Sequence, residues 1–144
     1  MTSKEGKKQM ILQRKNDLGT ISVSNTVFAQ IVADSFGLVI GKAWPGTKKG
    51  KQIGNDIKFN LSELESTLQV TEIDDELYIK FYIIVKFGAS IKSITDELMK
   101  YCFENIAKVY GRKPTEIVIC VSGIKSKQIA KRDIEVAARD EDYR

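Results

Sequence analysis

Residues 77–87 read LYIKFYIIVKF, and this stretch decides the fold. Side chains of a β-strand point alternately to the two faces of a sheet, so every second residue shares a face. One set of alternate positions is wholly apolar and predicts a buried face: Leu77, Ile79, Phe81, Ile83, Val85 and Phe87. The other set is amphipathic: Tyr78, Lys80, Tyr82, Ile84 and Lys86. The stretch therefore predicts a strand with one core face and one mixed face.

A long helix is predicted directly after this strand. Gly88 interrupts the strand, Ser90 or Ser93 can cap the helix, and the helix continues to about Tyr110 before Gly111 stops it. Its apolar residues recur at three- and four-residue spacing and predict a buried stripe: Ile91, Ile94, Leu98, Cys102, Ile106 and Val109. This helix should pack on the core face of the strand.

A last central strand is predicted at residues 117–121, where Val118 and Cys120 alternate with apolar residues on the core side. The tail from Ser126 shows helical spacing of its apolar residues together with charges of both signs. We expect this tail either to form an amphipathic helix or to fray.

Working toward the N-terminus, the residues before the central strand predict shorter elements. Residues 19–23 alternate as in a short strand, and Ser24 or Asn25 can cap a helix that ends near Gly37. Residues 44–56 contain glycines, a proline and lysines and predict a long exposed loop. Two further short strands are predicted at residues 57–61 and 68–73, followed by an acidic turn.

These elements follow one another as strand, helix, strands, helix, strand. Both helices have a single apolar face, so we expect both on the same side of a mostly antiparallel sheet, as a two-layer α+β sandwich. Residues 17–124 are expected to form one α+β domain. Residues 1–16 are expected to be a basic flexible arm, and residues 125–144 a charged tail that is helical if it is ordered.

Composition excludes several classes of protein. The chain has 144 residues, 42% of them apolar, which suits one globular domain, and it has no run of about 20 apolar residues that would span a bilayer. Its charged N-terminus leads into no apolar core of signal-peptide length, so a cytoplasmic location is expected. No histidine is present, and Cys102 and Cys120 lack zinc-ligand spacing. We therefore expect no metal, no cofactor and no catalytic site.

A basic loop is the first candidate binding site. Lys48, Lys49 and Lys51 lie between glycines in residues 42–58 and could contact phosphates of RNA or DNA. The spacing fits neither a P-loop nor a KH loop, and solvated surface is the commoner outcome for such a run. Nucleic-acid binding is therefore kept as the alternative function and is not favoured.

The mixed face of the central strand is the second candidate site. Tyr78, Tyr82 and Ile84 would lie there with Val118 of the last strand, on the side of the sheet that the helices leave uncovered. An apolar patch with a lysine rim often marks an interaction surface on a monomeric domain. Cover by the N-terminal arm or by a C-terminal helix is the competing prediction. If neither covers the face, it should mediate self-association or docking to an anchor protein.

Two stretches carry a resemblance to a known family. The first is GTISVSNTVFAQIVADSFGLVIG at residues 19–41, and the second is residues 68–124, with Phe87-Gly88, Ser90-Ile91, Gly111 and Val121-Ser122-Gly123-Ile124 at its landmarks. Both stretches resemble the alkaline shock protein family, a general-stress or envelope stress response family of Gram-positive and related bacteria. The resemblance does not cover residues 1–16, the basic loop with residues 55–66, or the tail.

The resemblance implies a non-enzymatic, abundant, self-associating cytoplasmic protein linked to cell-envelope stress. Some members of the family sit at the membrane through a separate integral anchor, so a membrane-anchor protein is an implied partner beside a second copy of the chain. The family offers no catalytic residues to transfer to this sequence. The expected function is thus that of a scaffold or interaction protein, with a nucleic-acid-binding module as the alternative.

Overall fold

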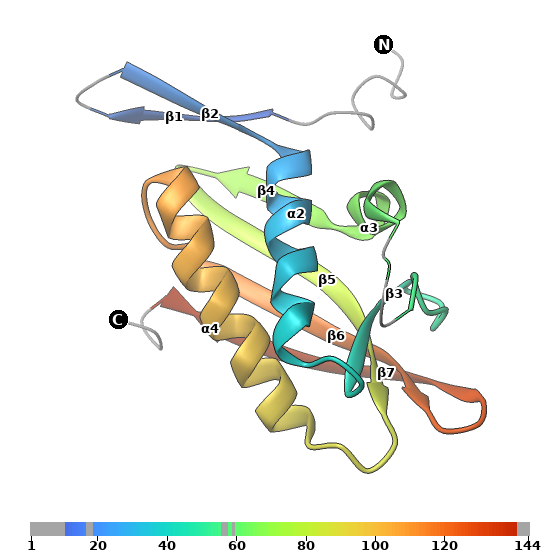
Figure 1. Ribbon diagram of the computed structural model, residues 1–144. Helices are drawn as coiled ribbons and strands as arrows, with labels where there is room; N and C mark the ends of the chain where they lie inside the picture. The colour runs from blue at the N-terminus through green and yellow to red at the C-terminus, as the bar shows by residue number, and fades with distance from the viewer. Residues whose placement is uncertain (1–10, 17–18, 56–57, 59, 141–144) are drawn as a thin grey trace.

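The computed structural model describes residues 11–16, 19–55, 58 and 60–140, and for residues 11–16 and 19–23 it describes the backbone. The elements are β1 (Ile11–Asn16), β2 (Gly19–Ser24), α2 (Asn25–Ser35), the 3₁₀ helix η1 (Phe36–Leu38), β3 (Ala43–Gly46), α3 (Leu61–Thr67), β4 (Gln69–Ile73), β5 (Glu76–Lys86), α4 (Ile91–Tyr110), β6 (Glu116–Lys125) and β7 (Ile129–Arg139). Figure 1 shows helices α2 and α4 side by side on one face of the main sheet.

Strand β5 is the centre of the main sheet. Its one edge pairs in parallel with β6, which pairs antiparallel with β7, and its other edge pairs antiparallel with both β3 and β4. Within the described chain the sheet therefore has five strands and three antiparallel pairings against one parallel pairing. The predicted class, α+β with a mostly antiparallel sheet, is confirmed.

The core lies between the sheet and the two helices. The predicted inward positions of β5 from Leu77 to Val85 are all buried, and Leu98, Cys102 and Ile106 of α4 face them. Phe36 packs edge-on against Phe81, with ring centroids 6.4 Å apart. Helix α4 begins and ends as its sequence predicts. The Ser90 side chain accepts a hydrogen bond from Ser93 N–H at 3.1 Å, and Gly111 adopts a left-handed φ of 95°.

Two residues predicted for the core lie at the surface. Phe87 follows the last residue of β5, where the turn at Gly88, with φ of 86°, takes the chain away from the sheet. The Phe87 side chain is consequently 70% exposed. Val109, at the edge of the α4 stripe, is 38% exposed. Alternation alone could not indicate that the strand ends one residue before Phe87.

The predicted C-terminal helix is wrong, because the tail forms strand β7. This strand pairs antiparallel with β6 over nine residue pairs, from Glu116 with Arg139 to Lys125 with Ile129. Ile134, Val136 and Ala138 also alternate, so the sequence was compatible with both periods. The unpaired backbone groups of β6 favour the strand, since tertiary contacts override weak helical spacing.

The N-terminal half differs from its prediction in three places. Residues 44–56 were expected to be an exposed loop, but Ala43–Gly46 form the buried strand β3, and Ile53 is also buried. Strand β2 forms at the predicted residues, yet it pairs with β1 in a separate two-stranded sheet and does not join the main sheet. Residues 11–16 of the predicted arm are thus a strand, and residues 1–10 lie outside the described residues. Of the strand predicted at residues 57–61, residues 57 and 59 lie outside the described residues, and Leu61 begins α3, where Asn60 caps the helix by accepting a hydrogen bond from Glu63 N–H at 3.1 Å.

Candidate functional site

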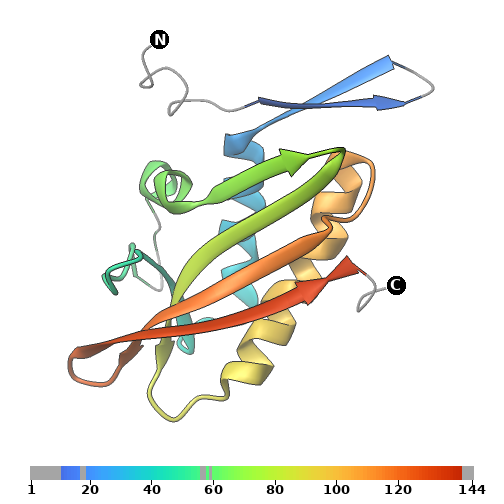
Figure 2. The ribbon, with the colours of Figure 1, turned by 180° about the vertical axis from the view of Figure 1, so that it is seen from behind.

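No helix of the described residues lies on the face of the main sheet opposite α2 and α4, and we call this face the open face (Figure 2). Pairing of β5, β6 and β7 arranges its residues in rows: Tyr78–Glu116–Arg139, Lys80–Val118–Ala137, Tyr82–Cys120–Glu135 and Ile84–Gly123–Lys131. All four residues predicted for partner binding, Tyr78, Tyr82, Ile84 and Val118, belong to these rows. They differ in exposure, because one end of the open face is covered.

The cover is the segment at residues 47–53, which we call the lysine loop. Ser122 Oγ donates a hydrogen bond to the Thr47 carbonyl oxygen at 2.7 Å, and Lys125 Nζ lies 2.8 Å from Gln52 Oε1. Ile53 and Ile84 are both fully buried. The lysine loop, and not a C-terminal helix, therefore closes this end of the open face. Ile84 lies in its packed part and is not available to a partner.

Glycines permit this close contact between the loop and the sheet. Gly50 has a left-handed φ of 90°, and a Cβ at this position would lie 2.9 Å from the Ser122 carbonyl oxygen. A Cβ at Gly123 would lie 2.6 Å from Ile129 Cγ2 and 2.9 Å from Ile84 Cδ1. Only residues without side chains let the lysine loop, β6 and β7 approach so closely.

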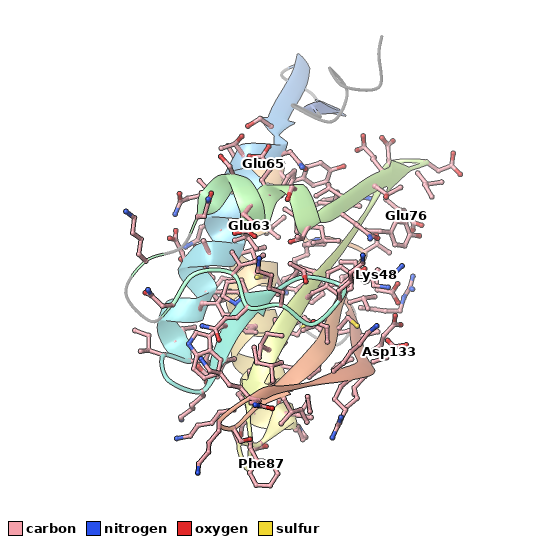
Figure 3. The ribbon with its side chains drawn as sticks, turned by 90° about the vertical axis from the view of Figure 1, so that its right-hand side faces the viewer. Lys48, Glu63, Glu65, Glu76, Phe87 and Asp133 are labelled. Atoms are coloured by element: carbon pink, nitrogen blue, oxygen red, sulfur yellow. The ribbon has the colours of Figure 1, made fainter. Side chains whose placement is uncertain are left out.

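Beyond the loop, the open face forms a pocket of about 580 Å³. Lys48 and Lys49 line it from the lysine loop, and β5 and β6 contribute Lys80, Tyr82 and Cys120. Strand β7 adds Lys131, Arg132, Asp133 and Glu135. Figure 3 shows Lys48 and Asp133 projecting on the same side of the molecule. The pocket thus brings Tyr82 of the predicted partner-binding set together with Lys48 and Lys49 of the predicted basic loop. The other predicted residues do not line it: Tyr78, Ile84, Val118 and Lys51.

Part of the charge in this pocket is neutralised internally. Lys80 Nζ forms an ion pair with Glu135 Oε2 at 2.9 Å, and the hydrogen bond to Glu135 raises the pKa of Lys80. The Cys120 thiol donates to Asp133 Oδ1 at 3.6 Å. Within the described part of the chain, Lys48, Lys49, Lys131 and Arg132 form no ion pair. The pocket therefore keeps a surplus of positive charge.

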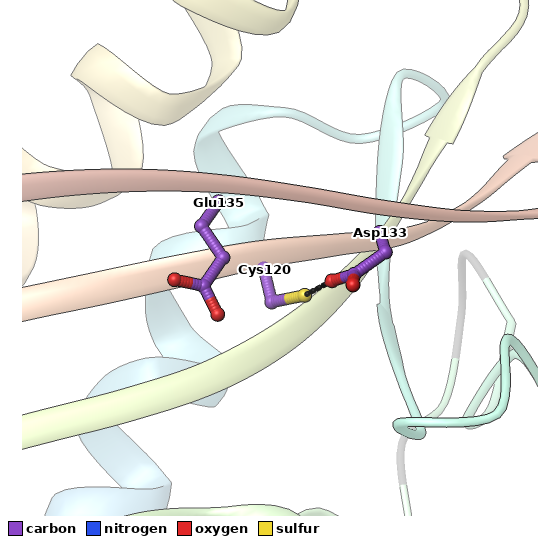
Figure 4. A group of neighbouring side chains, drawn as sticks. All are labelled: Cys120, Asp133 and Glu135. Atoms are coloured by element: carbon purple, nitrogen blue, oxygen red, sulfur yellow. Dashed lines mark hydrogen bonds between the residues drawn. The ribbon is translucent and has the colours of Figure 1, made fainter.

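Cys120, Asp133 and Glu135 place three ligand atoms within 4.8 Å of one another (Figure 4). Burial and the adjacent Asp133 raise the pKa of Cys120, so the thiol keeps its proton. A metal ion would have to displace that proton and compete with Lys80 for Glu135. The surrounding lysines would also repel a cation. The arrangement accordingly suits an anionic group better than a metal ion.

Sequence reasoning missed the residues that β7 contributes to the pocket. It treated residues 125–144 as a tail, and helical spacing would have scattered Lys131, Arg132 and Asp133 around a helix. The signal that could have found them is the alternation of Ile134, Val136 and Ala138 beside a strand with an open edge.

Most of the chain, including the loop, β5 and β6 residues of the pocket, matches a known protein family. Residues 13–126 match the model of the alkaline shock protein family, which is described as having a cell envelope-related function. The chain belongs to this family. No curated protein and no solved structure that was compared with it matches significantly. None of the helices in the described residues is at once long and apolar enough to cross a membrane.

The family match covers only some of the residues that line the pocket. Its lysine-loop, β5 and β6 residues lie inside the matched range, whereas Lys131, Arg132, Asp133 and Glu135 follow residue 126. The matched region therefore supplies the β5 and β6 part of the open face and its loop cover. Strand β7, beyond the matched range, supplies the outer wall of the pocket and one edge of the sheet.

Proposed function

We propose that this alkaline shock protein is a non-enzymatic, self-associating scaffold of the envelope stress response, and that it associates through its open face. The observation that carries the proposal is the uncovered middle of that face. Tyr78 and Val118 are half-buried there, and no helix of the described chain covers them. An apolar centre with a charged rim is the usual anatomy of an interaction surface.

The charges around Val118 suit contact between two identical faces. Lys80 pairs with Glu135 on one side, and Arg139 pairs with Glu116 at 3.3 Å on the other. Each pair offers a cation and an anion to a symmetry-related copy, so a two-fold contact can exchange partners without like-charge repulsion. Strand β7, which pairs only with β6 among the described strands, adds a free edge beside this face.

A non-enzymatic role is supported by the chemistry of the pocket. The raised pKa of Cys120 keeps its sulfur in the weakly nucleophilic thiol form. Glu135 is held by Lys80 and is a poor candidate for a free general base. We also propose that the protein is cytoplasmic and that its open face can dock on a membrane-anchor protein.

Sedimentation velocity over a range of concentrations tests the proposal. We expect the wild type to form concentration-dependent oligomers and the double variant Tyr78→Ser/Val118→Ser to shift toward monomer while circular dichroism stays unchanged. The control is Val109→Ser, which removes a partly exposed apolar side chain from α4 in the opposite layer. A folded double variant with the wild-type distribution would show that the open face is not the interface.

Nucleic-acid binding is the second candidate function, favoured by the four cations of the pocket that form no ion pair in the described chain. Three of the four would be reversed in Lys48→Glu/Lys49→Glu/Lys131→Glu, which should abolish retention on a nucleic-acid column if phosphates bind there. Retention of the wild type that falls steeply with salt and is lost in the variant would place this function first. No retention of the wild type at moderate salt would reject it.

A further inference from the structure

Three of the four most exposed large apolar side chains of the described chain gather at one end of the molecule. Phe87 is 70% exposed, Ile40 is 62% exposed and Leu38 is 51% exposed. Phe87 projects from that end in Figure 3, and Glu76 lies toward the other end. A soluble domain tolerates single exposed apolar residues, but a group of them marks a contact surface.

Backbone hydrogen bonds hold the three segments of this end together. Lys86 N–H donates to the Lys42 carbonyl oxygen at 2.8 Å, and Phe87 N–H donates to the Lys125 carbonyl oxygen at 2.7 Å. The turn that carries Ile40 is closed by Lys42 N–H donating to the Val39 carbonyl oxygen at 2.9 Å. Leu38, Ile40 and Phe87 therefore sit on neighbouring, anchored turns, and we call this end the basic tip.

The charge of the basic tip has one sign. Residues 36–43, 86–95 and 121–132, which build it, contain lysines and arginine and no Asp or Glu. Asp96 is the nearest acidic residue along α4, and it already pairs with Lys92 at 2.8 Å. The surplus of positive charge around exposed apolar groups is the combination that binds an anionic membrane surface.

A pocket of about 470 Å³ lies within the tip, lined by the Trp44 and Phe87 side chains and by Lys86, Lys125 and Lys127. Lys125 Nζ lies 4.6 Å from the centroid of the Trp44 ring and is held there by Gln52. The described lining includes no carboxylate. Its size and charge suit a phosphate headgroup whose acyl chains meet Phe87 and Ile40.

We infer that the basic tip docks the chain directly on an anionic lipid bilayer, with Phe87, Ile40 and Leu38 entering the interface. Lys42, Lys86 and Lys127 surround these side chains and bind lipid phosphates. The family's cell envelope-related function places a bilayer within its functional setting. This attachment uses the end of the molecule and leaves the open face free, so it is independent of the proposed self-association.

The opposite end of the sheet supplies a matched control. Ile73 is 55% exposed, a fraction between those of Ile40 and Leu38. Unlike those two residues, it adjoins an acidic turn, Asp74-Asp75-Glu76. An anionic surface repels that end. Ile73 therefore matches Ile40 and Leu38 in exposure and differs from them in the sign of the surrounding charge.

Vesicle flotation with full-length protein tests the inference. We expect binding to phosphatidylcholine vesicles that contain about 30% phosphatidylglycerol and little binding to pure phosphatidylcholine, with loss of binding at high salt. Ile40→Ser/Phe87→Ser and Lys86→Glu/Lys127→Glu should each weaken binding by about tenfold or more. Ile73→Ser should bind as the wild type does, and circular dichroism should show all variants folded.

Tryptophan substitution gives a second, independent readout. Brominated lipids quench a tryptophan that enters the acyl region, so Phe87→Trp should be quenched beyond the Trp44 background of the wild type, and Ile73→Trp should not. Absence of wild-type binding to anionic vesicles would overturn the inference, as would equal quenching at both positions. Capture of a protein by a photo-crosslinker at Phe87, without vesicle binding, would assign the tip to a protein partner and contradict lipid docking.

Discussion

The two faces of the main sheet are covered in different ways. On one face, α2 and α4 bury a continuous apolar layer that includes Phe81, Leu98 and Ile106. On the open face, the lysine loop covers only the end around Ile84, and it is held by hydrogen bonds such as that from Ser122 to Thr47. A face packed by long helices opens only when the domain unfolds, whereas a face closed by a short loop can open locally. The packed core and the proposed binding surface thus lie on opposite sides of one sheet.

Shortening a buried side chain on the helix-covered face should have the largest effect on the free energy of unfolding. Leu98 is fully buried, so Leu98→Ala should lower the free energy of unfolding by about 2–5 kcal/mol through lost contacts and a residual cavity. Chemical denaturation followed by circular dichroism measures this change. Val109→Ala on the exposed side of the same helix is the control and should cost much less. An unchanged denaturation midpoint for Leu98→Ala would mean that α4 does not pack as described.

Loosening the lysine loop should have a smaller and more local effect. Ser122→Ala removes the hydrogen bond to the Thr47 carbonyl oxygen and should cost about 0.5–1.5 kcal/mol. Amide hydrogen exchange should accelerate in residues 47–53 and stay unchanged in α4. Equal acceleration in both regions would show that the loop and the core open as one unit, and the contrast between the two faces would fail.

The helix-covered face could be predicted from the sequence because its signals are local. The alternation of residues 77–87 and the spacing of Leu98, Cys102 and Ile106 identify which side chains face inward without knowledge of their partners. Caps such as Ser90 and Gly111 set the ends of α4 from neighbouring residues alone. The buried layer and the α+β class follow from these patterns.

The open face could be predicted only in part because its cover is nonlocal. Tyr78, Tyr82, Ile84 and Val118 were assigned to this face by alternation, but nothing near Ile84 indicates that residues 47–53 fold over it. Strand β7 was missed for the same reason. Its spacing fits a helix or a strand, and the edge of β6 decides between them. Contacts between distant segments, which single-sequence patterns do not encode, therefore determine the pocket.

The two cysteines report on the two faces of the sheet. Cys102 is fully buried between α4 and the sheet, where burial raises its pKa to about 12. Cys120 lines the pocket of the open face. Because the thiolate is the reactive form, both should be labelled slowly at neutral pH and faster as the pH rises. Cys120 needs only local opening, so it should react well before Cys102, whose labelling requires unfolding of the domain.

The most direct test of association through the open face is the labelling rate of Cys120 as a function of protein concentration, with Cys102 as the internal reference. If two copies associate through their open faces, labelling of Cys120 should slow as the oligomer forms and should stay fast in Tyr78→Ser/Val118→Ser. Formation of the oligomer without any change in the labelling rate of Cys120 would show that the copies do not associate through their open faces.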